Sequence, residues 1–300
     1  MDFSNWRYEI TTHIEQILDD HLPSEILGEV IRYSVLPTGK LFRPLLVYSL
    51  ANDLDEVTEN HQSFACSLEL HHTYTLIHDD LPAMDDDDYR RGRLSSHKKF
   101  NEWKAILAGD GLLNLSYQLL AEIDSPHLPH ILKDYAQFMG PKGLILGQAL
   151  DLNHNIESFK AVLRVHELKT ARLIQLAFRG ANYLCEKPLS LQTCDELGLS
   201  LGICFQLLDD LCELSEEVSE HEKEINPFLK FDFNTVTQQL IFHIQTVKNI
   251  GERNQLATTL KYIDEYFQKI LTHLENQQGE IEERIGHSIK SVIEALTIKA

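Results

Sequence analysis

The stretch LIHDDLPAMDDDDYRRGR, which runs from Leu76 to Arg93, places many acidic and basic side chains close together. Six aspartates lie within ten residues, and the pair Arg90 and Arg91 follows almost at once. So many carboxylates repel one another unless cations screen them. Mg²⁺ takes oxygen ligands and often joins protein carboxylates to substrate phosphates, while arginine offers several N–H donors to phosphate oxygens. The stretch therefore predicts a site for a diphosphate and metal ions.

A solvated acidic loop is the competing interpretation, because runs of like charge are usually solvated or disordered. Against it, the run follows an apolar stretch, and a second acidic cluster of similar pattern lies at residues 202–213. A calcium-binding EF-hand is excluded. No frame that starts at Asp85, Asp86 or Asp87 has both glycine in sixth place and glutamate in twelfth.

The composition is that of an ordinary globular protein, with 300 residues, 43% of them hydrophobic and 24% charged. The net charge of −19 argues against a nucleic-acid-binding surface, which would be basic. Local cations or metals must therefore hold any anionic substrate. The N-terminal residues lack the basic region and apolar core of a signal peptide, no apolar run of 18 residues occurs, and the five cysteines form an odd, scattered set. These features predict a cytoplasmic protein in a reducing compartment.

Helical periodicity dominates the chain, with apolar residues three and four positions apart. Alternating β-branched runs, which mark strands, are nearly absent, and no linker or repeat divides the sequence. We therefore predict one all-α domain over residues 1–300, built from about ten helices. Its last segment, 280–300, could pack as a final helix or remain loosely held. The clearest helical segments are Glu25–Tyr33, Glu102–Glu122, Phe159–Asn182, Leu191–Glu217 and Asn234–Lys248.

Pro82 decides the local geometry around the first aspartates. It disfavours helical backbone at Leu81, so the preceding helix should end near Asp80. Asp79 would then lie on the last helical turn and Asp85 beyond the break, where both could reach one ion.

The second acidic cluster is Gly202–Glu213, GICFQLLDDLCE. Asp209 and Glu213 are four residues apart with no proline between them, so they share one helix face, and Gln206 lies one turn earlier on it. Like charges at this spacing repel, which indicates a cation as partner. A solvated acidic face fits this cluster equally well when it is taken alone. Together, two acidic helix faces behind apolar helices could hold one metal cluster from opposite walls.

Two basic motifs complete the pattern. Lys40 and Arg43, in Pro37–Pro44, are three apart, so one turn can direct both at a single anion. Exposed, solvated side chains are the simpler interpretation of this pair alone. Lys169 precedes the mostly apolar run Ala171–Ala177. It is either a solvated helix lysine or a cation pointed into a central cavity.

These motifs resemble the trans-isoprenyl diphosphate synthases, most closely the short-chain bacterial farnesyl diphosphate synthase type. The match covers Leu22 to Pro227. HTYTLIHDDLPAMDDDDYRRGR is nearly the family's first aspartate-rich motif. GKLFRP, AILAGDGLL, GQALDL, LKT and GxxFQxxDD occur in the family's order.

The resemblance implies the isoprenoid synthase fold, an all-α bundle around a deep central cavity, usually as a homodimer. It implies the addition of isopentenyl diphosphate to dimethylallyl or geranyl diphosphate, with farnesyl diphosphate as the product and a cluster of three Mg²⁺ ions as cofactor. The alternatives are a geranyl or geranylgeranyl diphosphate synthase and a weakly active or non-catalytic subunit. A terpene cyclase is disfavoured because it needs no second diphosphate site.

The resemblance also assigns roles by matching position. The residues expected to bind Mg²⁺ are Asp79, Asp85 and Asp209. Those expected to hold waters or outer contacts are Asp80, Asp210 and Glu213. The allylic diphosphate should face Arg90, Lys169, Thr170, Gln206 and Lys223. Isopentenyl diphosphate should be held by Lys40, Arg43, His72 and Arg91. The residues on which catalysis should depend are Asp79, Asp80, Asp85, Asp209 and Lys169.

Tyr74 lies five residues before Asp79, hence about 140° round the helix and one turn deeper. An aromatic residue there belongs to the core by default. In the family, a bulky residue at this place closes the cavity floor and limits product length, and an aromatic one favours fifteen carbons.

The sequence departs from the family's pattern in several places. Thr38 and Leu41 replace a usual glycine and arginine, and Glu213 replaces the last aspartate of the second motif. The following loop, ELSEEVSEHEKEINPFL, is short and acidic. Lys223 matches either the first or the second of the family's loop lysines. These departures favour weaker closure over substrate, or a non-catalytic subunit.

Overall fold

The computed structural model describes residues 3–153, 156–216 and 225–297, and the chain folds as two compact units. The N-terminal unit comprises Met1–Leu132 with Tyr183–Glu186, and the C-terminal unit comprises Lys133–Asn182 with Lys187–Ala300. In sequence, α7 (Leu128–Met139) leads from the first unit into the second. The single domain expected over residues 1–300 stays a prediction.

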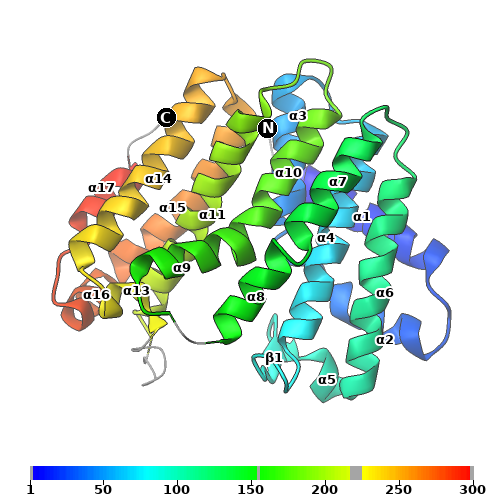
Figure 1. Cartoon of the computed structure of the whole chain (residues 1–300), viewed down its shortest axis with the longest axis horizontal. Coiled ribbons are helices and arrows are strands. Elements are labelled where there is room, and N and C mark those ends of the chain that lie inside the picture. The colour runs from blue at the N-terminus through cyan, green and yellow to red at the C-terminus, as the bar shows by residue number, and fades with distance from the viewer. Residues whose placement is uncertain (1–2, 154–155, 217–224, 298–300) are drawn as a thin grey trace. The chain divides into compact units, whose positions relative to one another are not determined.

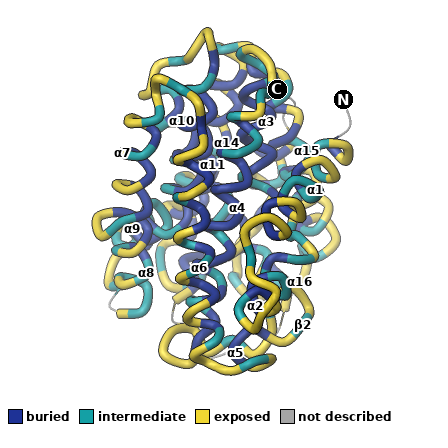
Figure 2. The backbone as a smooth tube through the Cα atoms, turned by 90° about the vertical axis from the view of Figure 1, so that its right-hand side faces the viewer, coloured by how far each residue is buried: buried dark blue, intermediate teal, exposed yellow. Residues whose placement is uncertain are grey.

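The N-terminal unit is built around α4 (Glu59–Asp79), which is buried along most of its length (Figure 2). The helix starts at a capping box, in which Thr58 and His61 bond each other's backbone and side chains. Apolar residues occupy all sides of α4, as expected of a helix enclosed by others. It packs against the helices α1 (Phe3–His21), α2 (Ile26–Val35), α3 (Phe42–Leu54) and α6 (Glu102–Ala121).

A short hairpin follows α4 and leads into α5 (Ser96–Lys99). Its strands β1 (Tyr89–Arg90) and β2 (Arg93–Leu94) pair antiparallel, with Tyr89 opposite Leu94. The two turn residues, Arg91 and Gly92, both have positive φ, of 51° and 72°, as a tight hairpin requires. The sequence did not predict this hairpin, because four strand residues are too few for an alternating pattern.

The C-terminal unit is organised around α11 (Leu191–Glu213), which packs against α14 (Phe233–Arg253) and the π-helical turn η1 (His166–Ala171) (Figure 1). Gly202 makes the second contact possible, because a Cβ there would lie 2.4 Å from the Cα of Ala171. The other elements of this unit are α8 (Leu144–Leu152), α9 (Phe159–Val165), α10 (Arg172–Tyr183), α13 (Pro227–Lys230), α15 (Ala257–Asn276), α16 (Gln278–Ile285) and α17 (Lys290–Thr297).

Most predicted helices are present, with two differences. The expected helix Phe159–Asn182 is interrupted by η1, which inserts a wider turn at the LKT motif. The C-terminal segment forms α16 and α17, and they are separated at Gly286, whose φ of 68° ends α16 in a left-handed conformation. None of the described helices is long and apolar enough to cross a membrane. All five cysteines are free thiols.

Candidate functional site

In the N-terminal unit, the predicted metal ligands Asp79 and Asp85 lie next to each other. α4 ends at Asp79, as Pro82 predicted, and the backbone N–H of Asp85 donates to the carbonyl of Asp79 at 2.9 Å. The loop therefore returns to the helix end, with Asp79 half-buried and Asp85 exposed. Two carboxylates on adjoining backbone offer the hard oxygen donors that Mg²⁺ takes, so these residues fit the ion. Their roles stay predictions.

Asp80 has a different environment, because it is only 3% exposed. Its Oδ1 accepts a hydrogen bond of 2.8 Å from Nε of Arg90, and Nη2 of the same arginine reaches Asp87 at 2.8 Å. Burial raises the pKa of the Asp80 carboxyl, and Arg90 opposes the shift. Arg90, which is expected to face the allylic diphosphate, is thus held in place by two aspartates of the same motif.

The basic residues expected to hold isopentenyl diphosphate gather around Glu69, a carboxylate that the sequence reasoning missed. Glu69 is 3% exposed, and its Oε1 lies 3.5 Å from Nη2 of Arg91. Burial raises its pKa, while the charges of Arg91 and Arg43 oppose the shift. The only hint in the sequence was one glutamate in the apolar run FACSLEL.

The charges of the same cluster also affect the pKa values of Arg43 and His72. Burial lowers the pKa of Arg43 to about 10, opposed by Glu69. Desolvation, and then the charges of Arg43 and Arg91, bring the pKa of His72 well below its usual range, so His72 is neutral at pH 7. Lys40 is exposed, and its neighbour Gly39 lies against Arg91, where a Cβ would come within 2.9 Å of Nη2. The structure therefore brings three of the four basic motif residues into one electrostatic cluster and places the fourth at its edge.

A pocket in this unit opens between α4 and the hairpin. It is lined by Tyr33, Ser34, Thr73, Leu76, Ile77, Asp80, Arg90, Arg91, Arg93, Leu94, Ser95 and Ser96. Two of the predicted diphosphate-binding arginines therefore share one concave surface.

Tyr74 is buried on α4, with 7% of its surface exposed. Its ring packs edge-on against His71 and His78, with centroid distances of 4.7 and 5.5 Å. Burial raises its pKa to about 12, which keeps the phenol neutral. The default interpretation as a core residue is confirmed, and the chain-length role stays a prediction.

In the C-terminal unit, α11 and η1 line a second pocket with several of the expected residues. Thr170 donates to Oε1 of Gln206 at 3.1 Å, and Nε2 of Gln206 donates to Oδ1 of Asp210 at 3.2 Å. Lys169 Nζ lies 2.6 Å from Oδ2 of Asp151. The lining residues are Asp151, Ile156, Val162, Val165, His166, Lys169, Thr170, Gln206, Asp210, Glu213, Ile225, Asn226 and Pro227.

The two aspartates of the second acidic cluster, Asp209 and Asp210, lie in different environments. Asp210 is 8% exposed and lines the pocket, where burial raises the pKa of its carboxyl well above the usual range. Asp209, the expected metal ligand, is exposed and is not among the residues lining this pocket. The assignment of Mg²⁺ to Asp209 stays a prediction, and Lys223 lies outside the described residues.

Three further residues belong to this pocket and were not assigned from the sequence. Asp151 pairs with Lys169, and His166 places Nε2 3.6 Å from Oδ2 of Asp210. Asn226 Nδ2 donates to the backbone carbonyl of Asp210 at 2.6 Å. Asp151 could have been found, because it closes the GQALD motif. The other two had no distinguishing pattern.

A family model described as polyprenyl synthetase matches residues 24–268. The chain belongs to the polyprenyl synthetase family. The match includes both acidic clusters, so the resemblance noted in the sequence is confirmed.

Relatives within the polyprenyl synthetase family support this membership. Farnesyl diphosphate synthase of Micrococcus luteus is 31% identical over 269 residues, which cover 87% of this chain and 92% of that protein. Farnesyl diphosphate synthase of Escherichia coli is 38% identical over 195 residues, or 62% of this chain and 65% of that protein. The crystal structure of geranyltranstransferase from Thermotoga maritima superposes with a TM-score of 0.78 at 29% identity and covers 88% of this chain and 97% of that one. The all-α fold class is thereby confirmed.

Proposed function

We propose that the chain is a short-chain prenyltransferase that condenses isopentenyl diphosphate with dimethylallyl or geranyl diphosphate, with farnesyl diphosphate as its product. The observation that carries this proposal is the cluster of Arg43, His72 and Arg91 around buried Glu69, on the same helix, α4, that ends at Asp79. A cationic anion site and a carboxylate pair in one unit suit two diphosphate substrates. Relatives named farnesyl diphosphate synthase support the choice of product.

Each group of residues has its own proposed substrate or metal. Arg43, His72, Arg91 and exposed Lys40 are proposed to hold isopentenyl diphosphate. Arg90 in the N-terminal unit, and Lys169, Thr170 and Gln206 in the C-terminal unit, are proposed to contact the allylic diphosphate. Asp79, Asp85 and Asp209 would hold Mg²⁺, which when bound supplies Lewis-acid stabilisation of a departing diphosphate.

The reaction needs no protein nucleophile. Breakage of the allylic carbon–oxygen bond puts negative charge on the leaving diphosphate, and fixed cations such as Arg90 stabilise that charge. The double bond of isopentenyl diphosphate then forms the new carbon–carbon bond, and a proton is lost to the departed diphosphate. The reaction requires apolar surroundings that keep water away from the allylic cation.

Product analysis separates this function from its alternatives. Purified protein is incubated with Mg²⁺, isopentenyl diphosphate and dimethylallyl or geranyl diphosphate, and the products are identified by mass spectrometry. A fifteen-carbon diphosphate supports the proposal. A ten- or twenty-carbon product indicates a geranyl or geranylgeranyl diphosphate synthase, whereas no product from either pair indicates a non-catalytic subunit. The control is the double variant Asp79→Asn/Asp85→Asn, which should lose at least about a hundredfold in kcat.

A homodimer and a cytoplasmic location are also part of the proposal. In the N-terminal unit, α6 exposes three large apolar side chains near its start: Trp103 at 54%, Ile106 at 42% and Leu107 at 47%. Residues three and four apart share one helix face, and a contiguous exposed apolar patch is a mark of a protein interaction site. A second copy of this chain is the proposed partner.

A further inference from the structure

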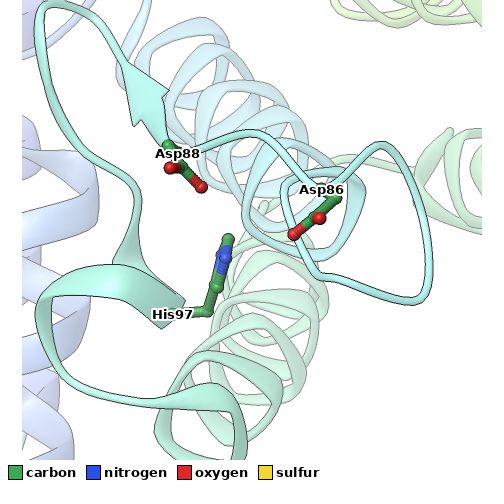
Figure 3. Close-up of side chains that lie close together, drawn as sticks. All are labelled: Asp86, Asp88 and His97. Carbon is green, nitrogen blue, oxygen red and sulfur yellow. The ribbon is translucent and has the colours of Figure 1, made fainter.

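A second group of potential metal ligands lies in the N-terminal unit, beside the predicted Mg²⁺ ligands but built from other residues. Asp86, Asp88 and His97 each place one ligand atom within 4.8 Å of the others (Figure 3). Asp86 and Asp88 come from the loop that follows α4, and His97 comes from α5. Figure 3 shows the imidazole of His97 directed between the two carboxylates.

The hairpin brings these three residues together. The N–H of Ser95 donates to the carbonyl of Asp88 at 2.9 Å, which extends the pairing of Tyr89 with Leu94 by one step. His97 therefore comes back alongside the segment that precedes β1. The hairpin is tied to α2, because Nη2 of Arg93 donates to the carbonyls of Tyr33 and Leu36 at 2.6 and 2.9 Å. These hydrogen bonds therefore hold Asp86, Asp88 and His97 close to one another.

His97 supplies the observation that points to a ligand. The residue is only 6% exposed, and its Nδ1 lies 3.1 Å from Oγ of Ser95. Its Nε2 is buried and has no hydrogen-bond partner within the described part of the chain. Leaving a buried polar nitrogen unsatisfied is costly. With the proton on Nδ1, donated to Ser95, Nε2 carries the lone pair that a metal needs, and this support of the second ring nitrogen is typical of metal-bound histidine.

The charges around the cluster are compatible with a bound cation. Asp86 and Asp88 are both exposed, so an ion can reach them. Lys98 Nζ lies 2.7 Å from Oδ1 of Asp88 and partly offsets the negative charge. Oδ2 of Asp88 is left for a metal.

We infer that Asp86, Asp88 and His97 bind one divalent transition-metal ion, with Zn²⁺ as the ion that the donor set suits best. Zn²⁺ accepts both imidazole nitrogen and carboxylate oxygen as ligands, and its catalytic sites use three protein ligands and leave a fourth position for water or another group. An imidazole donor disfavours Mg²⁺, which prefers an all-oxygen shell. The site therefore differs in ion as well as residues from the one proposed for Asp79 and Asp85.

Metal binding without substrate tests this inference independently of catalysis. The full chain is titrated with Co²⁺, a spectroscopic substitute for Zn²⁺, in excess Mg²⁺, and the visible d–d absorption is followed; Zn²⁺ is then added in competition. We expect one equivalent of Co²⁺ to bind with nitrogen and oxygen ligands and to be displaced by Zn²⁺.

The variants assign the ligands. His97→Asn keeps a polar group near Ser95 but removes Nε2, and Asp88→Asn removes a carboxylate; each should weaken Co²⁺ binding by at least about tenfold. Asp87→Asn is the matched control in the same acidic run, and Asp79→Asn/Asp85→Asn removes the predicted Mg²⁺ ligands. Both controls should bind Co²⁺ as the unaltered chain does.

Three results would overturn the inference: no Co²⁺ binding in excess Mg²⁺, unchanged affinity in His97→Asn, or loss of binding in Asp79→Asn/Asp85→Asn. If circular dichroism shows that His97→Asn does not fold, the exposed variants Asp86→Asn and Asp88→Asn decide the question. Unchanged Co²⁺ affinity in both would refute the site.

Discussion

Lys169 Nζ lies 2.6 Å from Oδ2 of Asp151, so the lysine expected at the allylic diphosphate already holds a carboxylate. The pairing depends on a close approach of α8 to η1. Gly147 lies one turn before Asp151 on α8, and a Cβ at Gly147 would lie 2.4 Å from the backbone nitrogen of Lys169. The missing side chain lets the two backbones approach, which brings Asp151 within reach of the lysine.

Asp151 therefore competes with a bound diphosphate for Lys169. We expect Lys169→Gln to raise KM for the allylic diphosphate by at least about tenfold, because a charge-assisted contact is lost. Asp151→Asn should lower that KM, because the lysine no longer has to leave a carboxylate. Steady-state kinetics with the allylic substrate varied will show the two directions. A rise in KM in both variants would mean that the pair acts as one unit and would refute the competition.

Glu69 is expected to stabilise the fold through its two arginines. Glu69→Gln keeps the shape of the side chain but leaves Arg43 and Arg91 without their buried counter-charge. Breaking a buried ion pair on one side costs about 3 kcal/mol, so the free energy of unfolding, measured by urea denaturation, should fall by about that amount. The control is Glu59→Gln at the exposed start of the same helix, which should change the unfolding free energy by less than about 1 kcal/mol. Equal effects of the two variants would contradict the role of Glu69.

Tyr74 is expected to limit product length. Truncation to alanine removes an aromatic ring that packs between His71 and His78, and the space it leaves should admit a longer chain. Tyr74→Ala should therefore shift the product distribution, analysed by mass spectrometry, from fifteen carbons toward twenty or more. Tyr74→Phe retains the ring and serves as the matched control. An unchanged distribution in the alanine variant would rule out the floor role.

His71 should make the protein less stable in acid. Burial lowers the pKa of its imidazole to about 3 in the folded chain, whereas an unfolded histidine titrates near 6.5. As pH falls through the window from about 6.5 to 3, the unfolded chain takes up a proton that the folded chain does not, so stability is lost. The loss reaches at most about 1.4 kcal/mol per pH unit.

The variant His71→Asn isolates this contribution. Urea denaturation across pH 4–7 should show a shallower decline of the unfolding free energy than in the unaltered chain. The substituted amide can retain the contact that Nδ1 of His71 makes with Oγ of Ser116 at 3.3 Å, so a general loss of structure is avoided. Parallel pH curves for the two proteins would exclude His71 as the source.

The exposed apolar side chains at the start of α6, Trp103, Ile106 and Leu107, are expected to be buried in the interface of a homodimer. Trp103→Glu/Leu107→Glu places two charges on that surface, and charge at an interface core is strongly unfavourable. Sedimentation velocity should show a dimer for the unaltered chain and a monomer for the double variant. Ile145→Glu alters an exposed apolar residue of the other unit and should leave the dimer intact. A monomeric unaltered chain at micromolar concentration would contradict the proposal.

The sequence by itself determined the helical class, the family and the end of α4. These depend on neighbours a few positions apart: apolar residues at helical spacing, and Pro82, whose ring acts on the residue before it. The two acidic clusters were visible for the same reason, since each is a short local run. The residue spacing also predicted that Asp209 and Glu213 share a helix face.

Only the tertiary structure decided which charged groups meet. Spacing within α11 does not say which side of the helix faces a pocket, and packing against η1 turned Asp210 inward and left Asp209 exposed. Glu69 reaches Arg91, and His97 reaches Asp86, only because the loop and hairpin fold back on α4. Such partners are set by distances between segments far apart in sequence, which no local pattern encodes.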